Sequence, residues 1–402
     1  MNVKNKIKVG IIRGKFLNKY EMQNFEPLSQ YFEIVTYASY RNLYNLKEIK
    51  LNIEKILTFE DIISNFLPIF KNILMRVLNR FLWSTYIIGI SRKIKDKDIV
   101  HVAELFNRYT IQTIKLKKRF GYKIVVTIWD TIPFNFIKPY RKGVFSIKQI
   151  KKYLKDIDFF IAINEKAKLS LKFYGVEDKK IMVLPMGIDI ERFSPLSKVE
   201  KNNLKFTMGI NINKKIILFI GRLVWEKGIY DIVFAIKFLV DYLKFKDNFS
   251  VFVIGEGSEK QNLEKLIEVL ELSDYIKILN HVSYEKIDEF YKIADIFILP
   301  SKPTYNWEEQ LGMVLLEAMA TGLPILTTSS GAIPEVVKDG GIIVPPGDFF
   351  SLSLNIEKLL EDEELRKKLG KRGREIAMEK FNRDKIAEKI AEIYSNVYYK
   401  IK

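Results

Sequence analysis

The chain lacks cysteine altogether and contains only two histidines, His101 and His281, among its 402 residues. The absence of cysteine excludes disulfides and thiolate metal sites, and the two histidines do not have the spacing of a metal-ligand motif. The first residues run into a strand-like segment without the apolar core of a secretory signal. We therefore expect a cytoplasmic protein with no disulfide and no metal site.

Charge is unevenly distributed along the sequence. Residues 1–200 contain 37 Lys and Arg against 19 Asp and Glu, an excess of 18, whereas residues 201–402 contain 29 against 30. A strongly basic half indicates an anionic partner, such as an acidic membrane, a phosphorylated acceptor or a nucleic acid. The excess also fits a lysine-rich composition that keeps the protein soluble.

The order of apolar and amphipathic segments predicts an α/β protein. A chain of 402 residues with 48% apolar residues is long enough for two cores. Short continuous apolar runs alternate with helical patterns, which is typical of parallel strands covered on both faces. We expect six strands in each half, a first domain at 1–200 and a second at 201–383. A C-terminal helix at about 384–402 is expected to pack back on the first domain.

One amphipathic stretch, residues 62–95, carries basic but no acidic residues within its helical part. Its apolar side chains recur at helical spacing, and Lys71, Arg76 and Arg80 occupy the opposite face. These charges argue against a membrane-spanning helix. The pattern fits a helix on an anionic membrane surface, and it also fits a helix that packs on the first sheet, which is the more usual role of such an apolar stripe.

Residues 221–228, with the sequence GRLVWEKG, follow an apolar strand. Gly221 allows a ligand to approach the backbone closely because it has no Cβ. Arg222 can bind two oxygens at once, and Lys227 supplies a compact positive charge. The segment therefore indicates a phosphate site, although an exposed turn with incidental charges has the same composition.

Residues 307–324, with the sequence WEEQLGMVLLEAMATGLP, place two carboxylates eight positions apart. Gly312 opens a predicted helix at 312–320, whose first N–H groups are free to bind an anion. Glu317 lies among apolar residues of that helix, where a carboxylate seldom lacks a partner. Carboxylates accept hydrogen bonds from hydroxyls, so Glu309 fits a sugar and Glu317 a ribose. Together the two segments predict a site for a nucleotide sugar.

These motifs resemble those of glycosyltransferase family 4, a group with the GT-B fold. The resemblance is strongest from about residue 159 to residue 346 and extends over nearly the whole chain. It depends on five segments taken together: GR…EKG at 221–228, LPS at 299–301, the two glutamates with AMATGLP at 309–324, SGAIPE at 330–335 and VPPGD at 344–348.

The resemblance implies two facing Rossmann-like, doubly wound domains with a cleft between them. It also implies a retaining hexosyl transfer, without a metal or other cofactor, from a UDP- or GDP-sugar to a glycan or lipid-linked acceptor. The implied catalytic residues are Glu309, Arg222 and Lys227. The implied donor-binding residues are Gly221, Glu317, Leu311, Gly312, Met313, Val282 and Gly331.

The first half departs from the family pattern where the acceptor is expected. Trp129 stands where family members often have a histidine, and residues 13–15 replace a Gly-Gly loop. His101 is a candidate for the acceptor side, although a histidine in this position is more often structural. The expected acceptor-side residues are His101, Glu104, Trp129, Asp130, Gly14 and Arg141.

Two other functions are compatible with the sequence. A nucleic-acid-binding protein would use the basic half, although aromatic residues are not interleaved with its basic clusters. A GT-B phosphorylase or epimerase would keep the fold, although no motif for a pyridoxal phosphate lysine is evident. We expect a nucleotide sugar and an acceptor as partners, possible attachment to an anionic membrane, and no nucleic acid.

Overall fold

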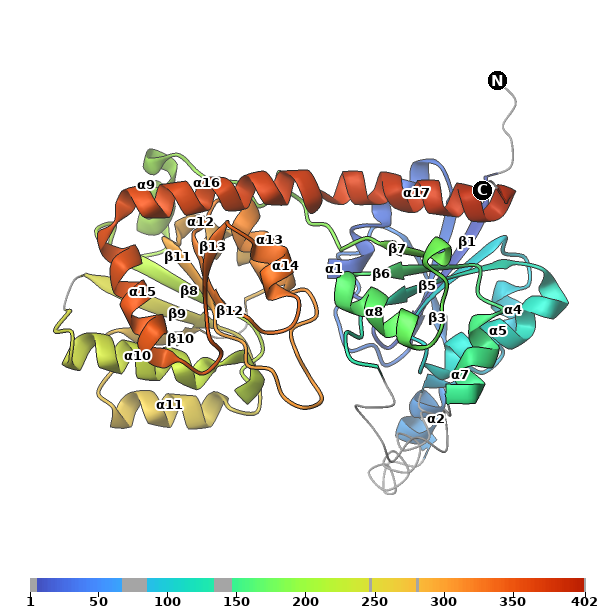
Figure 1. Ribbon diagram of the computed structural model, residues 1–402, viewed down its shortest axis with the longest axis horizontal. Coiled ribbons are helices and arrows are strands. Elements are labelled where there is room, and N and C mark those ends of the chain that lie inside the picture. Colours follow the sequence, from blue (N-terminus) through green and yellow to red (C-terminus); the bar gives the residue numbers. More distant parts are fainter. Residues whose placement is uncertain (1–5, 67–84, 134–146, 246–247, 280–281, 401–402) are drawn as a thin grey trace. The chain divides into compact units, whose positions relative to one another are not determined.

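A computed structural model describes residues 6–66, 85–133, 147–245, 248–279 and 282–400. The chain forms two compact units (Figure 1). Unit 1 consists of residues Met1–Gly187 and Arg383–Lys402, and unit 2 of residues Ile188–Asn382. The division lies at residue 188, before the expected division at residue 201.

Unit 1 is built on a parallel sheet of seven strands in the order β3-β2-β1-β4-β5-β6-β7. The expectation of six strands was wrong, because the edge strand β3 has the sequence NIEKI, which is not a continuous apolar run. An edge strand needs less apolar surface than a central one. The strands are β1 Lys8–Gly14, β2 Glu33–Ser39, β3 Asn52–Ile56, β4 Ile99–Ala103, β5 Lys123–Ile128, β6 Phe159–Ala162 and β7 Ile181–Val183.

Helices cover this sheet, and one of them comes from the C-terminal end of the sequence. Helix α17 buries Ile386, Ile390 and Tyr394 in the same apolar cluster as Val9 of β1. The described helices of unit 1 are α1 Lys19–Met22, α2 Phe59–Phe66, α4 Ile90–Ile94, α5 Arg108–Phe120, α7 Ile147–Leu154, α8 Glu165–Phe173 and α17 Arg383–Tyr399, with 3-10 turns η1 Glu26–Gln30 and η4 Asp178–Lys180.

Unit 2 contains a parallel sheet of six strands in the order β10-β9-β8-β11-β12-β13. The strands are β8 Lys215–Ile220, β9 Phe249–Ile254, β10 Ile276–Leu279, β11 Ile296–Leu299, β12 Ile325–Thr328 and β13 Gly341–Val344. The helices are α9 Lys198–Thr207, α10 Ile229–Asp241, α11 Lys260–Val269, α12 Ile287–Ile293, α13 Met313–Ala320, α14 Ile333–Val337, α15 Phe349–Glu361 and α16 Glu363–Lys380, with 3-10 turns η5 Trp225–Lys227 and η6 Tyr284–Lys286.

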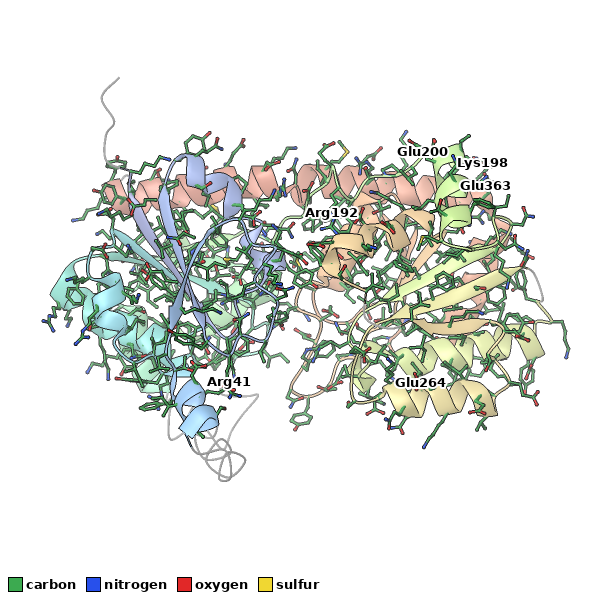
Figure 2. All side chains as sticks on the ribbon, turned by 180° about the vertical axis from the view of Figure 1, so that it is seen from behind. Arg41, Arg192, Lys198, Glu200, Glu264 and Glu363 are labelled. Atoms are coloured by element: carbon green, nitrogen blue, oxygen red, sulfur yellow. The ribbon has the colours of Figure 1, made fainter. Side chains whose placement is uncertain are left out.

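The segment 188–207 belongs to unit 2 because its contacts are there. The Ile188 N–H donates to the carbonyl of Phe381 at 2.7 Å. On α9, Lys201 pairs with Asp295 at 2.7 Å. Lys198, at the start of α9, lies near Glu363 at the start of α16 (Figure 2). The polar composition of residues 189–203 therefore marks the beginning of unit 2 rather than a free linker.

In each sheet, the order in which successive strands are added reverses once. In unit 2 this happens between β8 and β11, and in unit 1 between β1 and β4. Loops at the carboxyl ends of such neighbouring strands form the usual ligand-binding crevice of doubly wound sheets. Within the described part of the chain, no helix combines the length and apolar character needed to cross a bilayer. Most of the amphipathic stretch 62–95, namely residues 67–84, lies outside the described residues.

Candidate active site

In unit 2, two glycines allow the loops that follow neighbouring strands to pack closely against one another. Gly228 has φ +69°, and a Cβ there would lie 1.9 Å from the carbonyl oxygen of Pro300. Gly331 has φ +59°, and its Cβ would lie 2.0 Å from the carbonyl oxygen of Glu309. Only glycine fits these positions, because both the conformation and the space exclude a side chain. The loops after β8, β11 and β12 are thereby held against one another.

Lys227 and Glu309 meet in this crevice. The Lys227 Nζ donates to Oε2 of Glu309 at 2.5 Å, and the Ser301 hydroxyl donates to the same oxygen at 3.0 Å. Glu309 is only 6% exposed. The Lys227 ammonium also lies 5.1 Å from the ring centroid of Trp307, within the range of a cation–π contact. The structure thus brings together two of the three predicted catalytic residues.

The third, Arg222, follows β8 and Gly221 in the same loop and is exposed to solvent. Its guanidinium has no hydrogen-bonding or ionic partner among the described residues. A guanidinium without an internal partner is available to an anion. Arg222 and Lys227 therefore differ, because the Lys227 ammonium already donates to Glu309.

Helix α13 begins in the same crevice. Gly312 is its N-cap residue, with φ +70° and no side-chain hydrogen bond to the first turn. Gly312 has no side chain that could cap the first turn, in which the Leu315 N–H donates to the Gly312 carbonyl at 2.7 Å, and the helix dipole favours an anion at this end. Leu311, just before the helix, is buried. The predicted donor-binding residues Leu311, Gly312 and Met313 thus lie at the start of α13.

Glu317, within α13, is 2% exposed and is held by two tyrosine hydroxyls. Tyr291 donates to Oε2 at 2.7 Å, and Tyr284 donates to Oε1 at 3.1 Å. Burial raises the pKa of Glu317 to about 7, and the two tyrosine hydrogen bonds partly oppose that rise. The sequence indicated that this carboxylate needs partners but did not identify the tyrosines. Val282, the remaining donor-side candidate, is half-buried two residues before Tyr284.

The acceptor-side candidates of unit 1 divide into two groups. Glu104, with φ +63°, follows β4, and its Oε1 accepts from the backbone N–H groups of Trp129 at 2.6 Å and Asp130 at 3.2 Å. Burial, and then the neighbouring Asp130, raise the pKa of Glu104 well above its usual range. These three residues therefore lie together, and Glu104 and Asp130 line a hollow with apolar residues such as Phe106.

His101 is instead part of the core of unit 1. Its Nδ1 lies 2.7 Å from the Tyr394 hydroxyl of α17, and its Nε2 lies 2.7 Å from the Thr127 hydroxyl. Burial, together with the charge of Arg13, lowers the pKa of His101 to about 3. With both nitrogens engaged and the ring 2% exposed, His101 has a structural role in this fold, the second of the two interpretations offered by the sequence.

The structure says less about the remaining candidates, Gly14 and Arg141. Gly14 ends β1 with φ +56°, a conformation that favours glycine, and a Cβ there would lie 3.6 Å from the Tyr109 ring. Arg141 lies outside the described residues. Across the described residues, no group of three or more His, Asp or Glu side chains is arranged to hold a metal ion.

Two family models match this chain in adjoining segments. The family described as "Glycosyltransferase Family 4" matches residues 49–192, and the family described as "Glycosyl transferases group 1" matches residues 200–376. The second match contains every residue of the crevice in unit 2. The chain belongs to the GT-B glycosyltransferases of family 4.

The curated relatives match mainly over part of their length. An uncharacterized glycosyltransferase of Methanocaldococcus jannaschii is 30% identical over 224 residues, which cover 55% of this chain and 55% of that protein. The N-acetyl-alpha-D-glucosaminyl L-malate synthase of Bacillus anthracis is 31% identical over 206 residues, covering 51% of this chain and 50% of that enzyme. The chain spans about half the length of the curated relatives it matches.

A solved structure confirms the fold. The Anabaena HepE protein, crystallised in complex with UDP and glucose, superposes with a TM-score of 0.72 over 97% of this chain and 100% of that chain. The sequences are 16% identical, so this similarity concerns the fold alone. The GT-B fold predicted from the sequence, with two doubly wound parallel sheets, is confirmed.

Proposed function

We propose that this chain is a retaining glycosyltransferase that transfers a hexosyl unit from a UDP- or GDP-sugar to a glycan or lipid-linked acceptor. The observation that carries the proposal is the crevice of unit 2, where Lys227 pairs with Glu309 shortly before the start of α13, and where the loop that carries Lys227 also carries the exposed Arg222. The HepE complex supports a nucleotide-sugar donor, because a protein of the same fold binds UDP and glucose.

Each group of the crevice has a role in this proposal. Arg222, Lys227 and the free N–H groups of α13 bind the diphosphate and stabilise the charge that grows on it as the glycosyl bond breaks. Glu309, released from Lys227 by the incoming phosphate, accepts hydrogen bonds from sugar hydroxyls. Glu317 accepts hydrogen bonds from the ribose. No metal is required in this mechanism, because the cations are side chains.

The acceptor side is proposed to involve Glu104, Trp129 and Asp130, which lie together after β4 and β5. In a retaining front-face reaction, an oxygen of the departing phosphate takes the proton of the acceptor hydroxyl. The histidine that family members often carry at the position of Trp129 is then dispensable. The carboxylate of Asp130 orients the acceptor hydroxyl.

A donor screen tests the proposal. The protein is incubated with the common UDP- and GDP-sugars, with and without EDTA, and sugar release or transfer is followed by mass spectrometry. We expect one nucleotide class to be hydrolysed slowly and EDTA to have no effect. Glu309→Gln and Arg222→Ala are expected to remove the activity, and unchanged activity in both variants would overturn the assignment of the site.

We also propose that the protein is cytoplasmic and attaches to the surface of anionic membranes through unit 1. Lys151 and Lys152 of α7, and Lys155 just after it, are exposed, in keeping with the basic excess of this half. Vesicles of phosphatidylglycerol and phosphatidylcholine are expected to sediment the protein at low salt and to release it at high salt. Equal recovery in the supernatant with and without vesicles would contradict the attachment.

A further inference from the structure

The two oxygens of the Glu317 carboxylate accept hydrogen bonds of different length, from tyrosines that are buried to different degrees. Tyr291 is fully buried, and its hydroxyl lies 2.7 Å from Oε2. Tyr284 is half-buried, and its hydroxyl lies 3.1 Å from Oε1. Hydrogen bonds between hydroxyls and oxygen acceptors usually measure about 2.7–2.8 Å, so the Tyr284 bond is the weaker of the two. A competing hydroxyl would therefore displace Tyr284 rather than Tyr291.

The rest of Tyr284 is held by the segment with which unit 2 begins. The guanidinium of Arg192 (labelled in Figure 2) lies 4.5 Å from the centroid of the Tyr284 ring. The same guanidinium donates to the backbone carbonyl of Tyr284 and, at 3.0 Å, to Oδ1 of Asp288. Tyr284 thus has a firmly held backbone and ring, whereas the hydrogen bond from its hydroxyl to Glu317 is long.

We propose that Tyr284 is a positioning residue of the nucleotide site, whose hydroxyl competes with a ribose hydroxyl for Oε1 of Glu317. The inference rests on the proposed function, in which Glu317 binds ribose. It also explains how a carboxylate that is 2% exposed becomes reachable. A small rotation of the Tyr284 hydroxyl frees one oxygen, while Tyr291 continues to hold the other.

The groups that face Glu317 determine how this competition depends on pH. They are Tyr284 on η6, Tyr291 and Asp288 on α12, and Arg192. The two hydroxyls and Arg192 favour the ionised carboxylate, whereas burial and Asp288 oppose it. Removing the Tyr284 hydroxyl is therefore expected to raise the pKa of Glu317 further. Affinities are best compared at pH 9, where the carboxylate is ionised in both proteins.

The test compares UDP with 2′,3′-dideoxy-UDP, which lacks both ribose hydroxyls, by calorimetry on the wild-type chain and on Tyr284→Phe. If GDP binds more tightly in the donor screen, the corresponding guanosine pair is used. At pH 9, Tyr284→Phe is expected to bind UDP about fivefold more tightly, the equivalent of one ordinary hydrogen bond. Its affinity for the dideoxy nucleotide is expected to stay within about twofold of wild type.

Tyr230→Phe is a matched control, because the Tyr230 hydroxyl also donates to a glutamate, Glu259, at 2.6 Å. It is expected to change the affinity for the two nucleotides by the same factor. The pH below which UDP affinity falls, as Glu317 becomes protonated, is expected to rise in Tyr284→Phe only. An equal effect of Tyr284→Phe on both nucleotides, or weaker binding of UDP alone, would overturn the inference. Failure of the wild-type chain to bind UDP and GDP would instead overturn the proposed function.

Discussion

The carboxyl edges of the two sheets use charge in opposite ways. In unit 2, Lys227 and Glu309 are paired in the crevice, the loop of Lys227 also carries the exposed Arg222, and helix α13 starts at Gly312, which has no side chain to cap it. In unit 1, a buried glutamate is bound by backbone N–H groups, and the pKa of that glutamate is raised by burial and by Asp130. Unit 2 thus offers positive charge to a diphosphate, whereas unit 1 offers hydrogen-bond acceptors to hydroxyls. An excess of basic residues in the sequence of one unit therefore does not indicate the charge of its crevice.

The largest expected effect comes from removing the charges of the crevice in unit 2. Arg222→Ala and Glu309→Gln should each lower kcat/KM about 100- to 1,000-fold, because each removes a group that acts on the reacting part of the donor. Steady-state transfer or hydrolysis assays measure this effect. Lys237→Ala, which removes an ion pair on the partly exposed face of α10, is the control and should retain activity. A similar loss in all three variants would show that the effect is not specific to the crevice.

A second prediction separates packing from backbone conformation in unit 2. Gly331→Ala should lower the free energy of unfolding by roughly 3 kcal/mol or more, because its Cβ would collide with the carbonyl of Glu309. Gly209→Ala has a similar φ of +68° but nothing within 4 Å of its Cβ, so we expect a loss of only about 1 kcal/mol. Thermal or urea unfolding of the two variants measures the difference, and equal losses would contradict the interlocked loops.

A third prediction uses the pKa of Glu317, which burial raises to about 7. Ribose hydroxyls donate to the ionised carboxylate, so UDP binding should strengthen about tenfold from pH 6 to pH 8. Glu317→Gln should bind UDP with little change over this range, apart from the titration of the terminal phosphate of UDP, which affects both proteins equally. A slope that is the same in both proteins would show that Glu317 does not bind the nucleotide.

Ionisation of Glu317 strengthens UDP binding but lowers the stability of the fold. Its pKa is higher in the folded than in the unfolded chain, so protonation favours folding, and this contribution is lost as the pH rises from about 4.5 to about 7. Replacing Glu317 with Gln removes the titration. The midpoint of thermal unfolding of Glu317→Gln, relative to wild type, should therefore be higher at pH 8 than at pH 5, and a constant difference would contradict the pKa assignment.

The smallest effect on the donor is expected from unit 1. Asp130→Asn should raise the KM for the acceptor several-fold and lower the pKa of Glu104, since the neighbouring charge is removed. The affinity for UDP should stay within about twofold, because Asp130 has no role in the donor site. Calorimetry with UDP and acceptor-dependent kinetics measure the two quantities, and weakened UDP binding would remove the distinction between the two crevices.

The fold was largely predictable from the sequence. Buried parallel strands such as β8 and β11 are continuous apolar runs, which the sequence shows directly. The edge strand β3 was missed because its charged residues are tolerated only at the edge of a sheet. The boundary between the units was misplaced because residues 189–203 have a linker-like composition but pack on unit 2.

The site was predictable only where local sequence determines it. Glu309 and Glu317 share one segment, and a glycine-bounded loop carries Arg222 and Lys227, so the residue types and the family resemblance were enough to group them. The tyrosines that hold Glu317 lie 26 and 33 residues before it and reach it only through the packing of α12, and of the turn η6 that precedes α12, near α13. In the same way, the Tyr394 hydroxyl that engages His101 comes from 293 residues away. Such long-range partners have no signature in a single sequence.

The most direct test of the account is a crystal structure of the protein with UDP or GDP, whichever binds in the donor screen. The account predicts the diphosphate at the start of α13, with its oxygens within hydrogen-bonding distance of Arg222 and Lys227, and Lys227 moved from Glu309 toward the phosphate. A diphosphate bound elsewhere, with the ion pair of Lys227 and Glu309 intact, would contradict it.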